Sequence, residues 1–181
     1  MYASPSFVGH SLWLVPREPA RSTFQSVIDR LSSEKSTANF GAHVTLIAGV
    51  EPEGGVAEVI SKAEGLASEL TAISARVERT ACKDLYFQSV FALLARDKAL
   101  IDAHKAARLA FGQDPTEGSE YMPHVSLLYG DLPMSTREVI RQDTEPDLIN
   151  SEFELDSIQV WCTKGVVSEW KLVGSFPLQQ A

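Results

Sequence analysis

Two short segments of this 181-residue chain share one pattern, in which a histidine is followed by an apolar residue, a hydroxyl residue and a second apolar residue. The segments are His43-Val44-Thr45-Leu46 and His124-Val125-Ser126-Leu127. Side chains alternate between the two faces of a β-strand, so each segment places its histidine and hydroxyl on one face and its apolar residues on the other. The pattern predicts two strands that each present an imidazole and a hydroxyl, with apolar anchors behind.

The order of elements around the two segments is similar in each half of the chain. Helical spacing of apolar residues predicts a helix over 21–33 and another over 97–111, and a polar loop then leads into each histidine segment. Runs of apolar and β-branched residues predict the strands, and weaker helical spacing predicts two further helices. The expected strands are 11–15, 43–50, 73–80, 87–94, 124–129, 152–163 and 170–176, and the further helices are 56–70 and 135–142. This order predicts one α+β domain over residues 1–181, with helices outside mainly antiparallel sheets.

The charge balance limits the partners that the chain can bind. Asp and Glu number 24 against 16 Lys and Arg, for a net charge of −8, and the sequence has no basic stripe. Proteins that hold a long phosphate backbone carry such a stripe, because each neutralised phosphate releases counterions. We therefore expect a small-molecule substrate, no long nucleic acid and no membrane partner, and a monomer.

The apolar N-terminal stretch and the cysteines bear on location. Residues 7–15 contain His10 and lack a basic flank, which favours a strand over a signal peptide or a membrane span. Cys82 and Cys162 lie outside any metal-ligand spacing, and although they could pair, reduced buried thiols and a cytoplasmic setting are expected.

The paired histidines suit in-line displacement at phosphorus. A neutral imidazole can take a proton from water while a protonated one gives a proton to the leaving oxygen, and a pKa near 6.5 allows both forms near neutral pH. Thr45 and Ser126 would donate hydrogen bonds to the phosphoryl oxygens. The acidic residues form no carboxylate cluster and no metal-ligand spacing occurs, so no metal and no cofactor are expected. Which histidine is the base stays open.

Two other interpretations of the histidines are weaker. A nucleophilic Ser126 is disfavoured, because Gly-x-Ser-x-Gly is absent and Ser126 lies within a strand rather than on a sharp turn. The second interpretation is that the matched histidines have only a structural role, since short motifs also occur by chance in proteins without the activity. His10 and His104 lack the motif and are expected to be structural or exposed.

The two motifs resemble those of the two-histidine (2H) phosphoesterase superfamily, and more narrowly those of the cyclic phosphodiesterases of plants and yeast. Further segments carry the likeness, at Ser11-Leu12-Trp13, at Phe87-Gln88-Ser89-Val90-Phe91-Ala92-Leu93-Leu94 and at Tyr121-Met122-Pro123-His124-Val125-Ser126-Leu127-Leu128-Tyr129. The resemblance implies two pseudo-symmetric lobes with a central cleft.

The resemblance also implies an activity and its residues. Family members open ADP-ribose 1″,2″-cyclic phosphate, a by-product of tRNA splicing, to ADP-ribose 1″-phosphate, and nucleoside 2′,3′-cyclic phosphates to 2′-phosphates. His43 and His124 match the catalytic pair, and Thr45 and Ser126 match the phosphate-binding hydroxyls. Residues matching Tyr129, Phe87 and Trp13 line the pocket. A regular strand would point Tyr129 away from His124, so its role requires a bend at Gly130 or a bulge.

Two alternatives stay open within this interpretation. One is an enzyme acting on RNA ends, as a 2′,5′-phosphodiesterase or ligase, which the acidic charge balance disfavours. The other is a nucleotide-binding module without activity, which the two intact histidine motifs disfavour.

Overall fold

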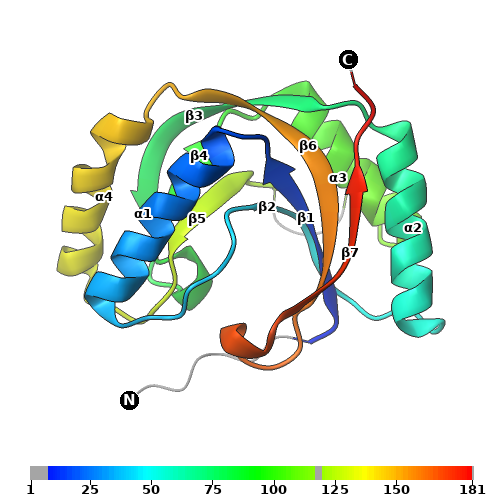
Figure 1. The fold of residues 1–181 in the computed structure, drawn as a ribbon, viewed down its shortest axis with the longest axis horizontal. Coiled ribbons are helices and arrows are strands. Elements are labelled where there is room, and N and C mark those ends of the chain that lie inside the picture. The colour runs from blue at the N-terminus through cyan, green and yellow to red at the C-terminus, as the bar shows by residue number, and fades with distance from the viewer. Residues whose placement is uncertain (1–7, 117–119, 181) are drawn as a thin grey trace.

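The computed structural model describes residues 8–116 and 120–180 of the chain (Figure 1). Over these residues it contains seven strands, four α-helices and two short 3-10 helices. The strands are β1 (His10–Pro16), β2 (Val44–Val50), β3 (Ile73–Cys82), β4 (Val90–Leu94), β5 (His124–Leu128), β6 (Glu152–Cys162) and β7 (Lys171–Pro177). The helices are α1 (Ala20–Lys35), α2 (Gly55–Glu69), α3 (Lys98–Ala110) and α4 (Met134–Leu148), with 3-10 helices η1 (Tyr86–Gln88) and η2 (Val167–Glu169).

The strands form a single antiparallel sheet in the order β1-β2-β5-β4-β3-β6-β7. β6 also pairs with β1, so six strands complete a circuit and β7 adds to its edge. β6 is long enough to do this because its first residues pair with β3 and the rest lies between β1 and β7. In Figure 1, α1 and α4 lie to one side of the strands and α2 and α3 to the other.

The chain repeats one order of elements. The first half runs β1-α1-β2-α2-β3, and the second runs β4-α3-β5-α4-β6. Each half gives its last strand to the other, because β3 pairs with β4 and β6 pairs with β1. β2 and β5 meet antiparallel through Val44 opposite Val125, the same position of the two histidine motifs. The predicted α+β fold with pseudo-symmetric halves is therefore confirmed, and the relation between the halves centres on the motifs.

The apolar residues of the two motifs form part of the core. Val44, Leu46, Val125 and Leu127 are all buried. α1 packs against β5 and α3 packs against β2, so each helix covers the histidine strand of the other half. This crossed packing holds the two strands together from both sides.

Three sequence predictions need correction. Phe87 does not begin a strand, because η1 turns the chain before β4 starts at Val90. The helix expected over 135–142 is α4 and ends only at Leu148, since Ile140, Thr144 and Leu148 continue its buried side through a polar sequence. Cys82 and Cys162 are free thiols that are half-buried rather than buried.

No helix within residues 8–116 and 120–180 combines the length and the apolar character that crossing a membrane requires.

Replacing Leu127 by Ala should lower the free energy of unfolding by about 2–5 kcal/mol, because a fully buried leucine leaves a cavity behind when it is truncated. Urea denaturation measures the change. Leu109 is 62% exposed on α3, and Leu109→Ala is the matched control, expected to stay within about 0.5 kcal/mol. Equal losses in the two variants would contradict the assigned core.

Candidate active site

Aromatic residues on neighbouring strands support the two histidines. Trp13 on β1 lies opposite Thr45, and Phe91 on β4 lies opposite Ser126. Opposite residues in antiparallel strands share a face, which is the face of His43 in one half and of His124 in the other. Trp13 stacks on His43, with ring centroids 3.6 Å apart and planes 8° apart. Phe91 meets His124 edge-on, with centroids 5.1 Å apart.

The same backbone hydrogen bond orients both imidazoles. The Nδ1 of His43 lies 2.6 Å from the carbonyl oxygen of Gly41, and the Nδ1 of His124 lies 2.8 Å from that of Met122. A carbonyl oxygen can only accept, so Nδ1–H is the donor in each case. The tautomer that results leaves Nε2 of each ring available for proton transfer.

The two rings differ in exposure and in pKa. His43 is 4% exposed, and burial lowers its pKa to about 3 against the opposing effect of the Gly41 bond, with the nearby His124 contributing. His124 is less covered, and burial lowers its pKa too, opposed by the Met122 bond and assisted by the positive charge of Lys83. The two histidines lie on neighbouring strands, because Val44 and Val125, which directly follow them, are opposite each other.

Both hydroxyl residues and His124 line one small cavity of about 170 Å³. Its other lining residues are Ser11, Ala48, Phe87, Gln88, Tyr129 and Thr163. Ser126 Oγ donates to the carbonyl oxygen of Phe87 at 3.2 Å, which positions the hydroxyl on the cavity wall. His43 lies beneath this surface rather than on the cavity wall, because its ring packs on Trp13 and against Phe40.

Tyr129 reaches the cavity because β5 contains a bulge. Val90 pairs with Leu128 but Phe91 pairs with Ser126, so β5 has one residue more than β4 at this point. The extra residue shifts the alternation and brings Tyr129 to the face of Ser126. Tyr129 is buried there and stacks on Phe40 with centroids 3.7 Å apart. The expected placement of Tyr129 on the cavity thus follows from the bulge.

The predicted aromatic lining is only partly found. Phe87 lines the cavity from η1, next to Tyr129. Trp13 does not line it and this expectation is corrected, because Trp13 is buried flat against His43 and also packs on Trp161. The structure gives Trp13 the role of a support for the His43 ring.

Sequence reasoning missed several residues of the site. Ala48 reaches the cavity because β2 has a second bulge, where Leu12 pairs with Ile47 but Trp13 pairs with Thr45. Arg137 of α4 is buried and donates from Nη1 to the carbonyl oxygen of Lys83, which holds the turn that carries Phe87 and Gln88. The sequence does not reveal the bulge, because the position of a bulge depends on the partner strand. It does not reveal the role of Arg137 either, because Arg137 lies in a polar segment.

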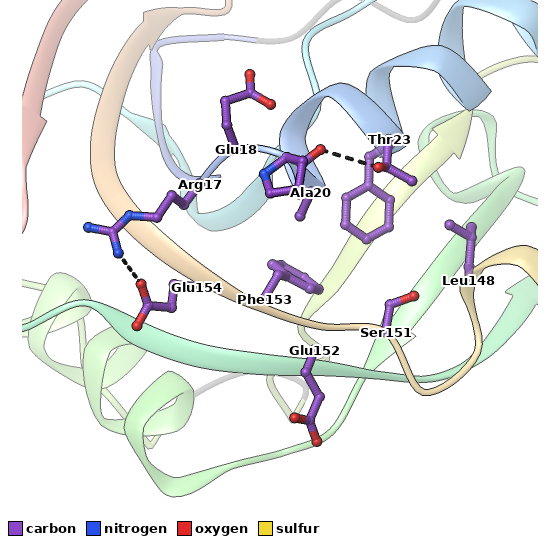
Figure 2. Close-up of a pocket in the computed structure, with 11 residues that line it drawn as sticks. Arg17, Glu18, Ala20, Thr23, Leu148, Ser151, Glu152, Phe153 and Glu154 are labelled. Atoms are coloured by element: carbon purple, nitrogen blue, oxygen red, sulfur yellow. Dashed lines mark hydrogen bonds and ion pairs between the residues drawn. The ribbon is translucent and has the colours of Figure 1, made fainter.

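A separate hollow of about 380 Å³ lies between the start of α1 and β6 (Figure 2). Figure 2 shows Arg17 directed at Glu154, and the two form an ion pair. Neither histidine motif contributes to this hollow. The candidate active site is therefore the smaller cavity between the motifs.

Comparison with known proteins agrees with this geometry. The family described as cyclic phosphodiesterase-like protein matches residues 8–178. The chain belongs to this family. A cyclic phosphodiesterase of Arabidopsis thaliana is 30% identical over 123 residues, which is 68% of this chain and 66% of that relative, just under two thirds of its length.

Solved structures share the fold of this cyclic phosphodiesterase-like chain. TT0787 of Thermus thermophilus superposes with a TM-score of 0.63 at 15% identity, covering 94% of this chain and 98% of that one. LigT of E. coli in its apo form gives a TM-score of 0.57 at 12% identity, and the superposition covers 97% of this chain and 100% of LigT. The predicted membership of the cyclic phosphodiesterase family is confirmed by the family match, and the superpositions confirm the predicted fold.

The buried His43 makes stability depend on pH. Its pKa is about 3 in the folded protein against 6.5 as the ordinary value, so the unfolded chain binds the proton first as the pH falls. The resulting stabilisation is present above pH 6.5 and is lost as the pH falls toward 3. Between pH 7 and pH 5 the loss should be on the order of 2 kcal/mol. Urea denaturation at several pH values should show a shallower dependence in His43→Phe, and an unchanged slope would contradict the buried neutral ring.

Proposed function

We propose that this chain hydrolyses ribose-fused cyclic phosphates by acid–base catalysis between His43 and His124. The observation that carries the proposal is the meeting of β2 and β5 at Val44 and Val125, which brings Thr45, Ser126 and His124 to one small cavity and places His43 beneath its wall. Membership of the cyclic phosphodiesterase-like family supports it. Such a reaction needs a proton acceptor, a proton donor and hydrogen-bond donors to the phosphoryl oxygens.

The reaction balances without further groups. Water attacks phosphorus in line with the ribose oxygen that leaves, so one P–O bond forms and one breaks. One Nε2 takes the proton of the water, and the other Nε2–H gives its proton to the leaving oxygen. The hydroxyl of Thr45 donates a hydrogen bond to a nonbridging oxygen, where negative charge accumulates, and the hydroxyl of Ser126 does the same after it rotates away from the carbonyl oxygen of Phe87. The product is an open phosphate monoester.

The difference in burial assigns the two proton-transfer roles in this proposal. His43 stays neutral because its ring is buried, so it is the base. His124 lines the cavity and is less covered, so it is the acid. A bound phosphate anion raises the pKa of both rings, because it stabilises the imidazolium form. This increase makes His43 a stronger base and favours the protonated form of His124, against the effect of burial.

The cavity suits a small cyclic phosphate. Its volume of about 170 Å³ accommodates the cyclic phosphate and part of the ribose, and Phe87 and Tyr129 offer aromatic surfaces to the sugar or base. We propose ADP-ribose 1″,2″-cyclic phosphate, opened to the 1″-phosphate, and nucleoside 2′,3′-cyclic phosphates, opened to 2′-phosphates. The net charge of −8 favours these over long RNA.

Substituting either histidine should separate catalysis from binding. His43→Ala and His124→Ala should each lower the turnover of adenosine 2′,3′-cyclic phosphate by roughly 10²- to 10⁴-fold, because each removes a proton-transfer step. Calorimetry with 2′-AMP should still detect binding in both variants. His10→Ala is the control and should stay within about twofold.

The same assay tests whether a metal is needed. Wild-type turnover should be unchanged by EDTA, since the proposed mechanism uses only side chains. Activity lost with EDTA and restored by a divalent cation would refute the metal-independent mechanism, and unchanged turnover in both histidine variants would refute the roles of the histidines.

A substrate with a better leaving group should test the role assignment. Catechol cyclic phosphate releases a phenol, which needs less protonation than a ribose alcohol. His124→Ala should therefore retain a larger fraction of wild-type kcat/KM on catechol cyclic phosphate than on adenosine 2′,3′-cyclic phosphate, by about tenfold or more. His43→Ala should lose similar fractions on both substrates. The reverse pattern would exchange the two roles.

A further inference from the structure

A second and larger cavity adjoins the small one. Its volume is about 760 Å³, and it shares Thr45, Ala48, Gln88 and His124 with the small cavity. It extends from the catalytic face toward the C-terminal half of α3. A substrate held at the two histidines can therefore reach it directly.

The lining of the larger cavity has more basic than acidic residues, although the protein as a whole is acidic. Among the residues that the structure describes, its charged lining consists of Lys83, Arg96 and Arg108 with one acidic residue, Glu120. The whole chain has the opposite balance, with 16 Lys and Arg against 24 Asp and Glu. A concave surface that concentrates one sign of charge attracts ligands of the opposite sign. The cavity is suited to an anion.

The three cations approach the cavity from different elements. Lys83 lies next to His124, with Nζ 3.6 Å from Sδ of Met122 and 6.0 Å from the centre of the Phe91 ring. Arg96 follows β4 and pairs with Glu120 at 2.8 Å, where its side chain is 41% exposed. Arg108 lies in the last turn of α3 and donates from Nε to the carbonyl oxygen of Asp114, a neutral acceptor. The positive charge of the lining therefore comes from three separate segments of the chain.

A stacked ring pair forms part of the wall. His104 and Tyr121 lie 3.9 Å apart with planes 1° apart. The Nδ1 of His104 is 2.7 Å from the carbonyl oxygen of Leu46. The hydroxyl of Tyr121 donates to the carbonyl oxygen of Thr45 at 3.0 Å. Both rings are therefore fixed to β2, the strand that carries the first motif. The wall is preorganised relative to the histidines.

We propose that this cavity binds a phosphate or diphosphate ester on the 5-carbon of the ribose whose cyclic phosphate is hydrolysed. The proposal rests on the proposed function and ranks its substrates, with those that carry a second anionic group preferred. With the cyclic phosphate at the histidines, the 5-carbon is the position at which a nucleotide ribose carries its other phosphate. Arg96 and Arg108 supply planar guanidinium donors, which suit phosphate oxygens.

A matched pair of substrates tests the proposal. Adenosine 2′,3′-cyclic phosphate and its 5′-phosphorylated form differ by one phosphate. Wild type should prefer the phosphorylated form by roughly ten- to hundredfold in kcat/KM at low salt, mainly through KM, since charge-assisted hydrogen bonds to phosphate add affinity. The double variant Arg96→Gln and Arg108→Gln should reduce this preference to about threefold or less, and kcat/KM for the unphosphorylated form should stay within about twofold.

Arg30→Gln is the matched control, because Arg30 is also a half-exposed arginine paired with a glutamate, on α1. It should keep the full preference. An absent preference in wild type, or a preference that survives the double variant, would overturn the proposal. A preference lost equally in Arg30→Gln would overturn it too, because net charge would then be the cause.

Two further substrates separate the sources of the second anionic group. ADP-ribose 1″,2″-cyclic phosphate carries a diphosphate, and the dinucleotide ending in a 2′,3′-cyclic phosphate carries an RNA phosphodiester. The double variant should lower kcat/KM for at least one of them, and no decrease for either would overturn the proposal.

Binding measurements keep this test independent of the proposed function. Adenosine 2′,5′-bisphosphate should bind wild type about tenfold or more tightly than 2′-AMP, and the double variant should bind them alike. Absence of turnover with every cyclic phosphate would refute the proposed function alone. Equal wild-type affinity for the two nucleotides would refute the phosphate subsite alone.

Discussion

The antiparallel pairing of Val44 with Val125 is the contact on which the site depends. It is where β2 and β5 meet, and it joins the same position of two equivalent motifs. Because each motif places His and hydroxyl on the face opposite its valine and leucine, burial of the apolar side in the core turns both polar sides the same way. The crossed packing of α1 on β5 and α3 on β2 holds this register. The site is thus a consequence of how the two halves of the core close.

Near symmetry at the backbone does not make the two histidines equivalent. Trp13 lies flat on His43, and Phe91 meets His124 at its edge. The flat contact covers His43, while His124 keeps access to both cavities. Burial lowers the pKa of both rings, and the rings differ in cover, since His43 is almost fully buried and His124 lines both cavities. A pair of similar motifs can in this way supply one base and one acid.

The sequence allowed prediction of the parts of the fold that depend on local periodicity. The helices, most strands and the His and hydroxyl faces follow from spacing alone. Contacts between segments far apart in the sequence could not be predicted. They include the bulges that bring Ala48 and Tyr129 to the cavity and the stacking of Trp13 on His43. The hydrogen bond from Arg137 to the carbonyl oxygen of Lys83 is another. The extension of α4 to Leu148 also escaped prediction, because tertiary packing outweighs its polar sequence.

The central claim is that His43 and His124 act on one shared phosphate. Nitrogen-15 NMR of the imidazole rings during titration with inorganic phosphate tests it most directly, since only four histidines contribute. The account predicts that the Nε2 signals of His43 and His124 shift together with one dissociation constant, while Nδ1 of each stays protonated and His10 does not respond. A shift of only one of the two rings, or two different dissociation constants, would contradict it.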